Sequence, residues 1–303
     1  MWGLVATLYC IGFFQRMAPA VIADDLMRDF SLDGVMLGNL SAMYFYAYAA
    51  MQIPTGLLVD QIGARRLASI ACLIAALGIL VFSFGSSLWL AYLGRFLVGA
   101  SVVVAWVTCM KLAGHWFPAN RFATVTGVAL LLGNIGGITA GVPLAVGVDL
   151  FGWRMMMWVS GFLTLVLAIV TWLALRDDPS EYGYRSHAPL VVQNHGSLPM
   201  GAALKSVVTR KDTWLLFFGG GLSTAPVLVF AGLWGVPYLT QVYHLETSQA
   251  ALITSTMLMS LAVSGPINGA ISDRLGRRKL PYLISTVLTT SFWAIFLLVK
   301  LSY

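Results

Sequence analysis

Long apolar runs separated by short polar segments make up most of this chain. A helix needs about 20 apolar residues to cross a bilayer, and nine runs reach that length. We expect membrane-spanning helices at residues 2–23, 36–58, 67–86, 88–112, 122–147, 153–175, 213–240, 248–271 and 280–300. The first run lacks the basic start of a signal peptide, and it is longer than the apolar region of a signal peptide. We therefore predict that it also spans the membrane.

The composition agrees with this pattern. Apolar residues make up 59% of the 303 residues and charged residues 10%, against roughly 45–50% and 25% in ordinary soluble domains. This balance excludes a water-soluble enzyme of two domains. The formal net charge is +6, but the basic residues stand between apolar runs and form no cluster typical of nucleic-acid binding. We therefore expect the lipid bilayer as a partner and no nucleic acid.

The basic residues lie mainly in one set of alternating loops. Twelve of the 18 are Arg65, Arg66, Arg121, Arg176, Arg185, Lys205, Arg210, Lys211, Arg274, Arg277, Arg278 and Lys279, whereas the opposite loops hold Arg28, Arg154 and Lys300. The positive-inside rule then predicts a multi-pass protein of the cytoplasmic (inner) membrane with a cytoplasmic N-terminus. We expect a six-helix bundle at residues 1–176, a cytoplasmic linker at 177–212 that contains several Pro and Gly, and a partial bundle of three helices at 213–303.

A short loop occurs twice, each time directly after an apolar run. The first copy contains Gly56, Asp60, Gly63, Arg65 and Arg66, and the second contains Gly269, Asp273, Arg274, Gly276, Arg277, Arg278 and Lys279. The copies stand 213 residues apart. Basic turns alone would explain the arginines but not the paired Gly and Asp, so the pattern indicates an internal duplication.

This duplicated loop resembles that of the major facilitator superfamily, whose members have two six-helix halves with one copy in each. The resemblance implies an all-α membrane protein with a complete N-terminal bundle and three helices of the C-terminal bundle. It also implies a gate, in which Asp273 contacts the start of the fifth helix near Arg121 and Asp60 contacts the eleventh helix. The family has twelve helices and this chain has nine runs, so we expect a truncated or partial sequence. The first copy departs from the family at Gln61, where a basic residue is usual.

Arg16 is the most informative polar residue inside a predicted span. At about 1.5 Å per residue it lies past the middle of the first helix, on the same face as Tyr9 and Phe13. An arginine is expensive in a membrane unless it pairs or faces water, and the nine runs contain no Asp or Glu deep inside. Backbone carbonyls, a water-filled cavity, a partner in further helices and an anionic substrate all remain open. The sequence before Arg16 also resembles organic-anion members of the superfamily, in which an arginine of this helix holds the anion.

Other polar and aromatic residues are candidates for the same substrate site. Two groups recur at four-residue spacing on a predicted helix face, and the family resemblance adds an arginine that faces the cavity near its outer end. The candidates are Tyr44, Tyr48 and Gln52, then Trp234 and Tyr238, and finally Arg95. Lys111 lies about 160° around the helix from Arg95, so we expect it to extend to the cytoplasmic surface instead.

We predict a transporter of a small solute, specifically an organic anion, that works by rocking-bundle alternating access. Coupling to a proton, exchange for a counter-anion and facilitated diffusion all remain open. The protein is expected to be a monomer, and neither a cofactor nor a metal is expected because no such motif is present. A neutral or cationic drug exporter, a sensor that does not transport, and a truncated product are the alternatives. Enzymatic activity is not expected.

Overall fold

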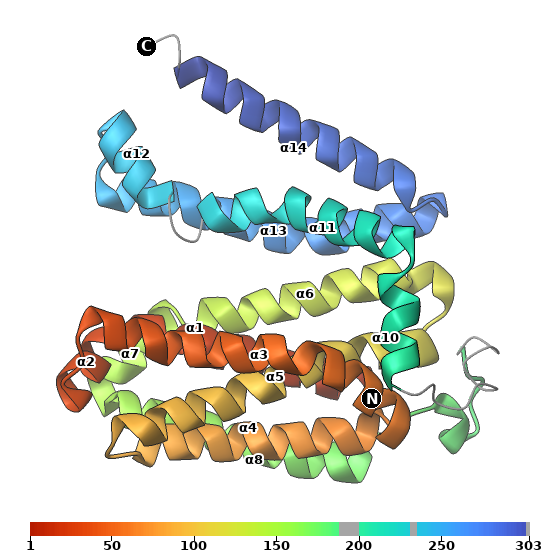
Figure 1. Ribbon diagram of the computed structural model, residues 1–303, viewed down its shortest axis with the longest axis horizontal. Helices are drawn as coiled ribbons and strands as arrows, with labels where there is room; N and C mark the ends of the chain where they lie inside the picture. Colours follow the sequence, from red (N-terminus) through yellow and green to blue (C-terminus); the bar gives the residue numbers. More distant parts are fainter. Residues whose placement is uncertain (188–199, 231–234, 301–303) are drawn as a thin grey trace. The chain divides into compact units, whose positions relative to one another are not determined.

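A computed structural model describes residues 1–187, 200–230 and 235–300. In these residues it contains helices and no strand (Figure 1). The chain divides into two compact units, one of residues 1–122 with 128–197 and one of residues 123–127 with 198–303. The start of the fifth predicted span thus belongs to the second unit, although the rest of that span belongs to the first.

The first unit contains most of the first six predicted spans. Its long helices are α1 (Trp2–Val21), α3 (Gly34–Ile62), α4 (Ala64–Phe84), α5 (Leu88–Trp116) and α8 (Trp153–Ala174). The fifth predicted span consists of two helices, α6 (Phe122–Thr139) and α7 (Val142–Phe151). The α4 helix packs along both α5 and α8, while α1 and α3 pack against α5 (Figure 1).

Short polar residues and glycines set several helix ends in this unit. The Asp33 carboxylate accepts a hydrogen bond from the backbone N–H of Met36 at 2.7 Å and thereby caps α3, as expected for an N-cap aspartate. The turn from α3 to α4 needs a backbone conformation that side chains disfavour, because Gly63 has φ of 84°.

Two glycines of α6 bring it close to α1. A Cβ atom at Gly133 would overlap the ring of Tyr9, and one at Gly136 would overlap the carbonyl group of Cys10. Only glycine therefore permits this helix spacing, as is common where membrane helices pack closely.

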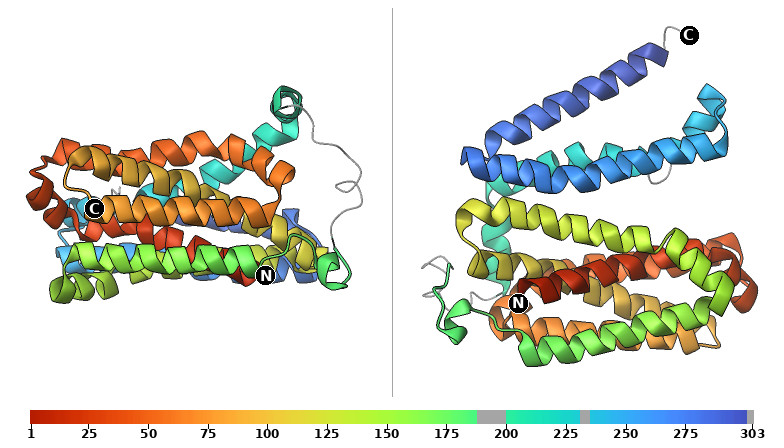
Figure 2. Two further views of the ribbon diagram at one scale, coloured as in Figure 1. Left: turned by 90° about the horizontal axis from the view of Figure 1, so that it is seen from below. Right: turned by 180° about the vertical axis from the view of Figure 1, so that it is seen from behind.

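The second unit contains the last three predicted spans. Its helices are α10 (Met200–Val208), α11 (Lys211–Val229), α12 (Gly235–Tyr243), α13 (Thr247–Leu275) and α14 (Lys279–Lys300). The α13 and α14 helices meet at the turn around Gly276 and diverge from there (Figure 2). An apolar cavity of about 800 Å³ lies among α11 to α14, with Phe230, Tyr243 and Trp293 in its wall.

The structure corrects the sequence prediction in two loops. The α2 helix (Ala23–Phe30) follows α1 directly, and α10 lies inside the segment predicted as a linker, which also contains the short 3₁₀ helix η2 (Pro179–Tyr182). A further 3₁₀ helix, η1 (Ala119–Arg121), precedes α6. The α2 helix is too short and too polar to span a membrane, so a search for apolar runs passes over it. Its Leu26 is nevertheless fully buried.

Among the described residues, five helical segments are long and apolar enough to cross a membrane. They are Trp2–Val21, Ala64–Phe84, Leu88–Trp116, Ala119–Phe151 and Trp153–Ala174. Together with the helical content, this supports the expected all-α membrane fold.

Candidate functional site

Arg16 lies on α1 with its guanidinium between two aromatic rings. The central guanidinium carbon is 5.4 Å from the ring centroid of Phe13 and 5.0 Å from that of Phe45. Aromatic faces attract a guanidinium, but they do not accept its hydrogen bonds as a carboxylate would. The Nε atom is buried without a hydrogen-bond partner, and none of the ion pairs formed by the described residues involves Arg16.

Arg95, on α5, is placed differently from the sequence expectation. Its side chain is only 1% exposed, and its Nη1 atom donates a hydrogen bond to the backbone carbonyl of Gln15 at 2.8 Å. Its guanidinium carbon also lies 5.0 Å from the ring centroid of Tyr44. The prediction that Arg95 faces the cavity is therefore wrong in this structure, because neighbouring helices enclose the side chain and a main-chain oxygen binds it.

Gln15 connects α1 to α8 beside Arg16, and the sequence analysis did not select it. Its side-chain amide donates to the hydroxyl of Ser160 at 3.2 Å and to that of Thr164 at 2.9 Å. Gln15 is 1% exposed. The signal was available, since an amide within an apolar membrane helix needs a polar partner. Arg95 on one side and α8 on the other thus hold the backbone next to Arg16.

The predicted tyrosines surround this region in the first unit. Tyr9 is 6% exposed, and its ring centroid lies 4.8 Å from that of Phe13 and 5.2 Å from that of Trp106. Tyr44 and Tyr48 stack with centroids 6.0 Å apart. The Tyr44 hydroxyl is buried without a hydrogen-bond partner.

The other predicted pocket residues are less closely associated with Arg16. Gln52 lies on the same helix as Tyr44 but is exposed. In the second unit, the Tyr238 ring packs against Phe230 and Phe296, at centroid distances of 5.7 and 5.8 Å. Trp234 lies outside the described residues.

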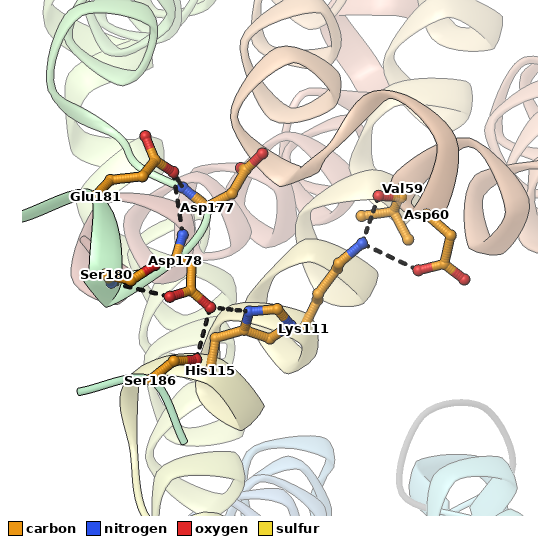
Figure 3. Close-up of polar contacts among 9 residues, drawn as sticks. All are labelled: Val59, Asp60, Lys111, His115, Asp177, Asp178, Ser180, Glu181 and Ser186. Atoms are coloured by element: carbon orange, nitrogen blue, oxygen red, sulfur yellow. Dashed lines mark hydrogen bonds and ion pairs between the residues drawn. The ribbon is translucent and has the colours of Figure 1, made fainter. Parts of the chain in front are cut away.

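In the first copy of the repeated loop, Asp60 pairs with Lys111 (Figure 3). The Lys111 Nζ atom lies 3.0 Å from Asp60 Oδ1 and donates to the backbone carbonyl of Val59 at 2.6 Å. Lys111 therefore extends to the exposed end of α3, where the first copy of the repeated loop lies. Asp60, for which the sequence analysis found no partner within this chain, has one on α5.

A polar segment after α8 binds the same end of the first unit. The Asp177 carboxylate accepts a hydrogen bond from the backbone N–H of Arg65 at the start of α4. Asp178 Oδ2 lies 3.0 Å from His115 Nδ1 and accepts a hydrogen bond from the Ser186 hydroxyl at 2.6 Å (Figure 3). Burial raises the pKa of Asp178, but hydrogen bonds from Ser186, Ser180 and His115 outweigh this effect and lower the pKa to about 2. The carboxylate is consequently ionised at neutral pH.

In the second copy, Asp273 binds the start of α6. Its carboxylate accepts hydrogen bonds from the backbone N–H of Ala123 at 3.3 Å, and from the backbone N–H and hydroxyl of Thr124 at 2.7 and 2.8 Å. Arg278 Nη1 lies 3.0 Å from the same carboxylate. The predicted contact of Asp273 with the start of the fifth span is therefore confirmed, and a carboxylate at this position also matches the positive end of the helix dipole.

The glycines and remaining arginines of the two copies differ in their surroundings. Gly63 and Gly276 have φ of 84° and 61°, which explains why both copies keep glycine there. A Cβ at Gly269 would overlap the carbonyl group of Ala123, whereas Gly56 has open space around it. The arginines that are exposed are Arg66, Arg274, Arg277 and Arg278.

Comparison with known proteins identifies the family. Residues 5–303 match the sequence family described as Major Facilitator Superfamily. This chain belongs to the major facilitator superfamily. The predicted membership is confirmed, and the chain is accordingly a multi-pass membrane protein of a transporter superfamily.

Two curated relatives and one solved structure illustrate the similarity within the superfamily. A probable sulfoacetate transporter of Cupriavidus necator is 24% identical over 280 residues, which cover 91% of this chain and 65% of that protein. A membrane sensor protein of Salmonella typhimurium is 25% identical over 294 residues, covering 90% of this chain and 62% of that protein. The chain thus spans somewhat less than two thirds of each relative. The superfamily transporter FucP, solved in an outward conformation, has a TM-score of 0.62 at 12% identity over 90% of this chain and 71% of its own.

Within the described residues, no group of three or more His, Cys, Asp or Glu side chains could hold a metal ion. The polar groups near Arg16 instead include the hydroxyls of Tyr9 and Tyr44 and the side-chain amide of Gln15. Such groups bind ligands through hydrogen bonds and charge.

Proposed function

We propose that this protein transports a small organic anion across the inner membrane by alternating access, with Arg16 as the residue that binds the anionic group. The N-terminal bundle of residues 1–176 and the partial C-terminal bundle of residues 213–303 act as the two rocking bundles, and residues 177–212 link them. Coupling to a proton or to a counter-anion is compatible with this mechanism, and so is a monomer.

The observation that supports an anionic substrate is the environment of Arg16. Its guanidinium has two ring faces beside it and a buried Nε donor without a partner. A carboxylate, sulfonate or phosphate matches a guanidinium because it accepts two parallel hydrogen bonds while neutralising the charge. Tyr44, whose hydroxyl is buried without a partner, is a second donor for such a ligand. Arg95 acts by holding α1 and not by binding the anion.

The relatives support the same chemistry. The substrate named for the Cupriavidus necator relative, sulfoacetate, is an organic anion with a sulfonate and a carboxylate. A cationic drug exporter would need a buried acid to attract its substrate, and the predicted spans have none deep inside.

We assign the gate to the repeated loop. Asp273 holds the start of α6 through three hydrogen bonds, and breaking these contacts releases that end of the helix. Gly269 and Gly276 permit the close approach and the turn at this contact, and Arg278 pairs with Asp273. In the first copy, the pair of Asp60 and Lys111 stabilises the first unit.

A sensor that binds the anion without transporting it is the second candidate. It is favoured by the relative described as a membrane sensor protein. Binding and transport measured on the same preparation distinguish the two functions, because a sensor binds the anion but shows no counterflow.

The test uses the full chain reconstituted in vesicles, with sulfoacetate and glycerol 3-phosphate as probes. We expect Arg16→Ala to weaken anion binding at least tenfold and to abolish uptake, since a charged hydrogen bond contributes about 1.5–3 kcal/mol and 1.4 kcal/mol is tenfold. Arg16→Lys should bind with intermediate affinity, because it keeps the charge and loses the fork geometry.

Arg28→Ala is the matched control. Arg28 is a largely exposed arginine that pairs with Asp25 on α2, so its loss changes the net charge equally without touching the site. If Arg16→Ala binds both probes as tightly as the unchanged protein, the role assigned to Arg16 is wrong.

A further inference from the structure

A shallow apolar groove runs between α4 and α8 on the first unit. It has a volume of about 300 Å³. Its wall consists of Ser69, Ile70 and Leu73 from α4, and of Leu165, Ala168, Ile169, Trp172 and Leu173 from α8. The one hydroxyl among them, that of Ser69, donates to the backbone carbonyl of Arg65 at 2.8 Å. The groove therefore offers a ligand only hydrocarbon and aromatic surface.

The side chains along the groove are exposed although they are apolar. Ile169 is 54% exposed, Leu173 65% and Trp172 49%. Both helices belong to the segments that are long and apolar enough to cross a membrane, so this surface lies where lipid chains replace water.

Two arginines stand at one end of the groove. Arg65 and Arg66 occupy the first turn of α4, about 6 Å before Ser69 and about 12 Å before Leu73 along the helix axis. The Arg65 Nε atom donates to the backbone carbonyl of Trp172 at 2.9 Å, and its guanidinium carbon lies 5.4 Å from the Trp172 ring centroid. Arg65 is thus fixed directly above the groove.

The positive charge of these arginines is available to a ligand. Neither Arg65 nor Arg66 takes part in the ion pairs of the described residues. Asp177 binds the backbone N–H of Arg65 without an ion pair to its guanidinium, and Glu181 lies 3.7 Å from Arg176. An apolar groove that ends at two guanidinium groups matches a molecule with a hydrocarbon chain and an anionic head.

We propose that the groove between α4 and α8 binds an anionic phospholipid, with an acyl chain along Ile70, Leu73 and Ile169 and the phosphate on Arg65 and Arg66. The preference over a zwitterionic lipid comes from the two arginines, each of which contributes about a fivefold increase in affinity near a membrane surface. This site is independent of the proposed anion transport, since it lies on the outside of α4 and α8 and not at Arg16.

Trp172 provides the readout, because it forms part of the groove. The full chain is reconstituted in phosphatidylcholine bilayers with increasing fractions of brominated phosphatidylglycerol or brominated phosphatidylcholine, and tryptophan fluorescence is recorded. Subtracting the signal of Trp172→Phe isolates the quenching of Trp172. We expect half-maximal quenching at an at least fivefold lower fraction of the brominated phosphatidylglycerol.

Arg65→Gln and Arg66→Gln should each reduce this preference about fivefold, while Arg28→Gln, with the same change of charge, should leave it unchanged. Quenching by phosphatidylcholine reports whether each variant remains folded, because it depends on the groove and not on the arginines. Equal quenching of Trp172 by both lipids in the unchanged protein overturns the proposal. Quenching by neither lipid also overturns it and indicates that another helix, for example from a second copy, covers the groove.

Discussion

Gln15 is the residue on which the geometry around Arg16 depends most directly. Its backbone carbonyl accepts a hydrogen bond from Arg95, and its side chain donates to Ser160 and Thr164. One residue is therefore bound to both α5 and α8, and Arg16 follows it in the chain. A ligand held by two parallel hydrogen bonds is sensitive to such positioning, since small misplacements are costly.

We predict that Gln15→Met weakens anion binding about five- to thirtyfold while Arg16 remains in place. The variant keeps the length of the side chain and loses two hydrogen bonds of about 1 kcal/mol each. Kd and the KM of uptake in vesicles measure the effect, and thermal unfolding shows how much of it is general destabilisation.

Thr7→Val is the control for this prediction, because Thr7 lies on the same helix and its hydroxyl donates only to the backbone carbonyl of Gly3. Unchanged KM and Kd in Gln15→Met, together with loss of binding in Arg16→Ala, would contradict a positioning role for Gln15.

At the residue scale, the sequence identified the charged residues inside predicted membrane helices but not the residues that contact them. Arg16 and Arg95 stand out because charge is rare in membrane helices. Helical periodicity gives the face of a residue but not which helix packs there, so the enclosure of Arg95 by α1 and the pairing of Lys111 with Asp60 were missed.

At the scale of elements, the two copies of the repeated loop each have a glycine with positive φ and differ in their contacts. Gly63 and Gly276 both have positive φ and both separate two long helices. Asp60 binds a lysine side chain, whereas Asp273 binds backbone N–H groups at a helix start. The glycines explain why this part of the loop sequence recurs. The aspartates show that the loop forms an ion pair with a lysine in one copy and main-chain hydrogen bonds in the other.

We predict that Asp273→Ala loosens the start of α6. The variant removes the acceptor for the backbone N–H groups of Ala123 and Thr124, and a hydrogen bond to a charged group contributes about 1.5–3 kcal/mol. Amide hydrogen exchange in a peptide that covers residues 122–130 should therefore become at least tenfold faster.

Asp60→Ala is the matched control, since it changes the same residue type in the other copy and should leave exchange at residues 122–130 unaltered. Equal exchange in Asp273→Ala and in the unchanged protein would show that Asp273 does not hold this helix end.

The positions of the long helices were predictable because apolar length is the main signal in a membrane chain, although only five helical segments of the described residues are long and apolar enough to span a membrane. The α6 helix and the first part of α7 lie within one predicted run, and no apolar pattern marks the break between them. The α2 and α10 helices were missed because they are short, and short helices depend on packing more than on local sequence.

For the whole molecule, the distribution of charge predicts the orientation in the membrane. The basic residues of one loop set exceed those of the other by 12 to 3. Gln61, in the first repeated loop, and Ser86, between α4 and α5, are both exposed and stand at opposite ends of α4.

We predict that Gln61→Cys is shielded from a membrane-impermeant maleimide in intact cells and that Ser86→Cys is labelled. Cell lysis should make Gln61→Cys reactive. Unchanged protein gives the background, since Cys72 and Cys109 are buried and Cys10 is partly buried. Labelling of Gln61→Cys before lysis would show that the orientation is opposite to the predicted one.

Family and fold could be inferred from the sequence because a duplicated loop and a series of apolar runs are properties of the chain as a whole. The substrate cannot be inferred in the same way, because it depends on how a few side chains such as Arg16 and Tyr44 converge. Those distances follow from packing between helices that lie far apart in the sequence.

The pairing of Lys111 with Asp60 makes the two copies of the repeated loop different in their contacts. The first aspartate pairs with a lysine of α5, whereas the second binds two main-chain N–H groups and a hydroxyl at the start of α6 and pairs with Arg278. The duplicated loop therefore joins its aspartate to a lysine side chain in the first copy and to the start of another helix in the second.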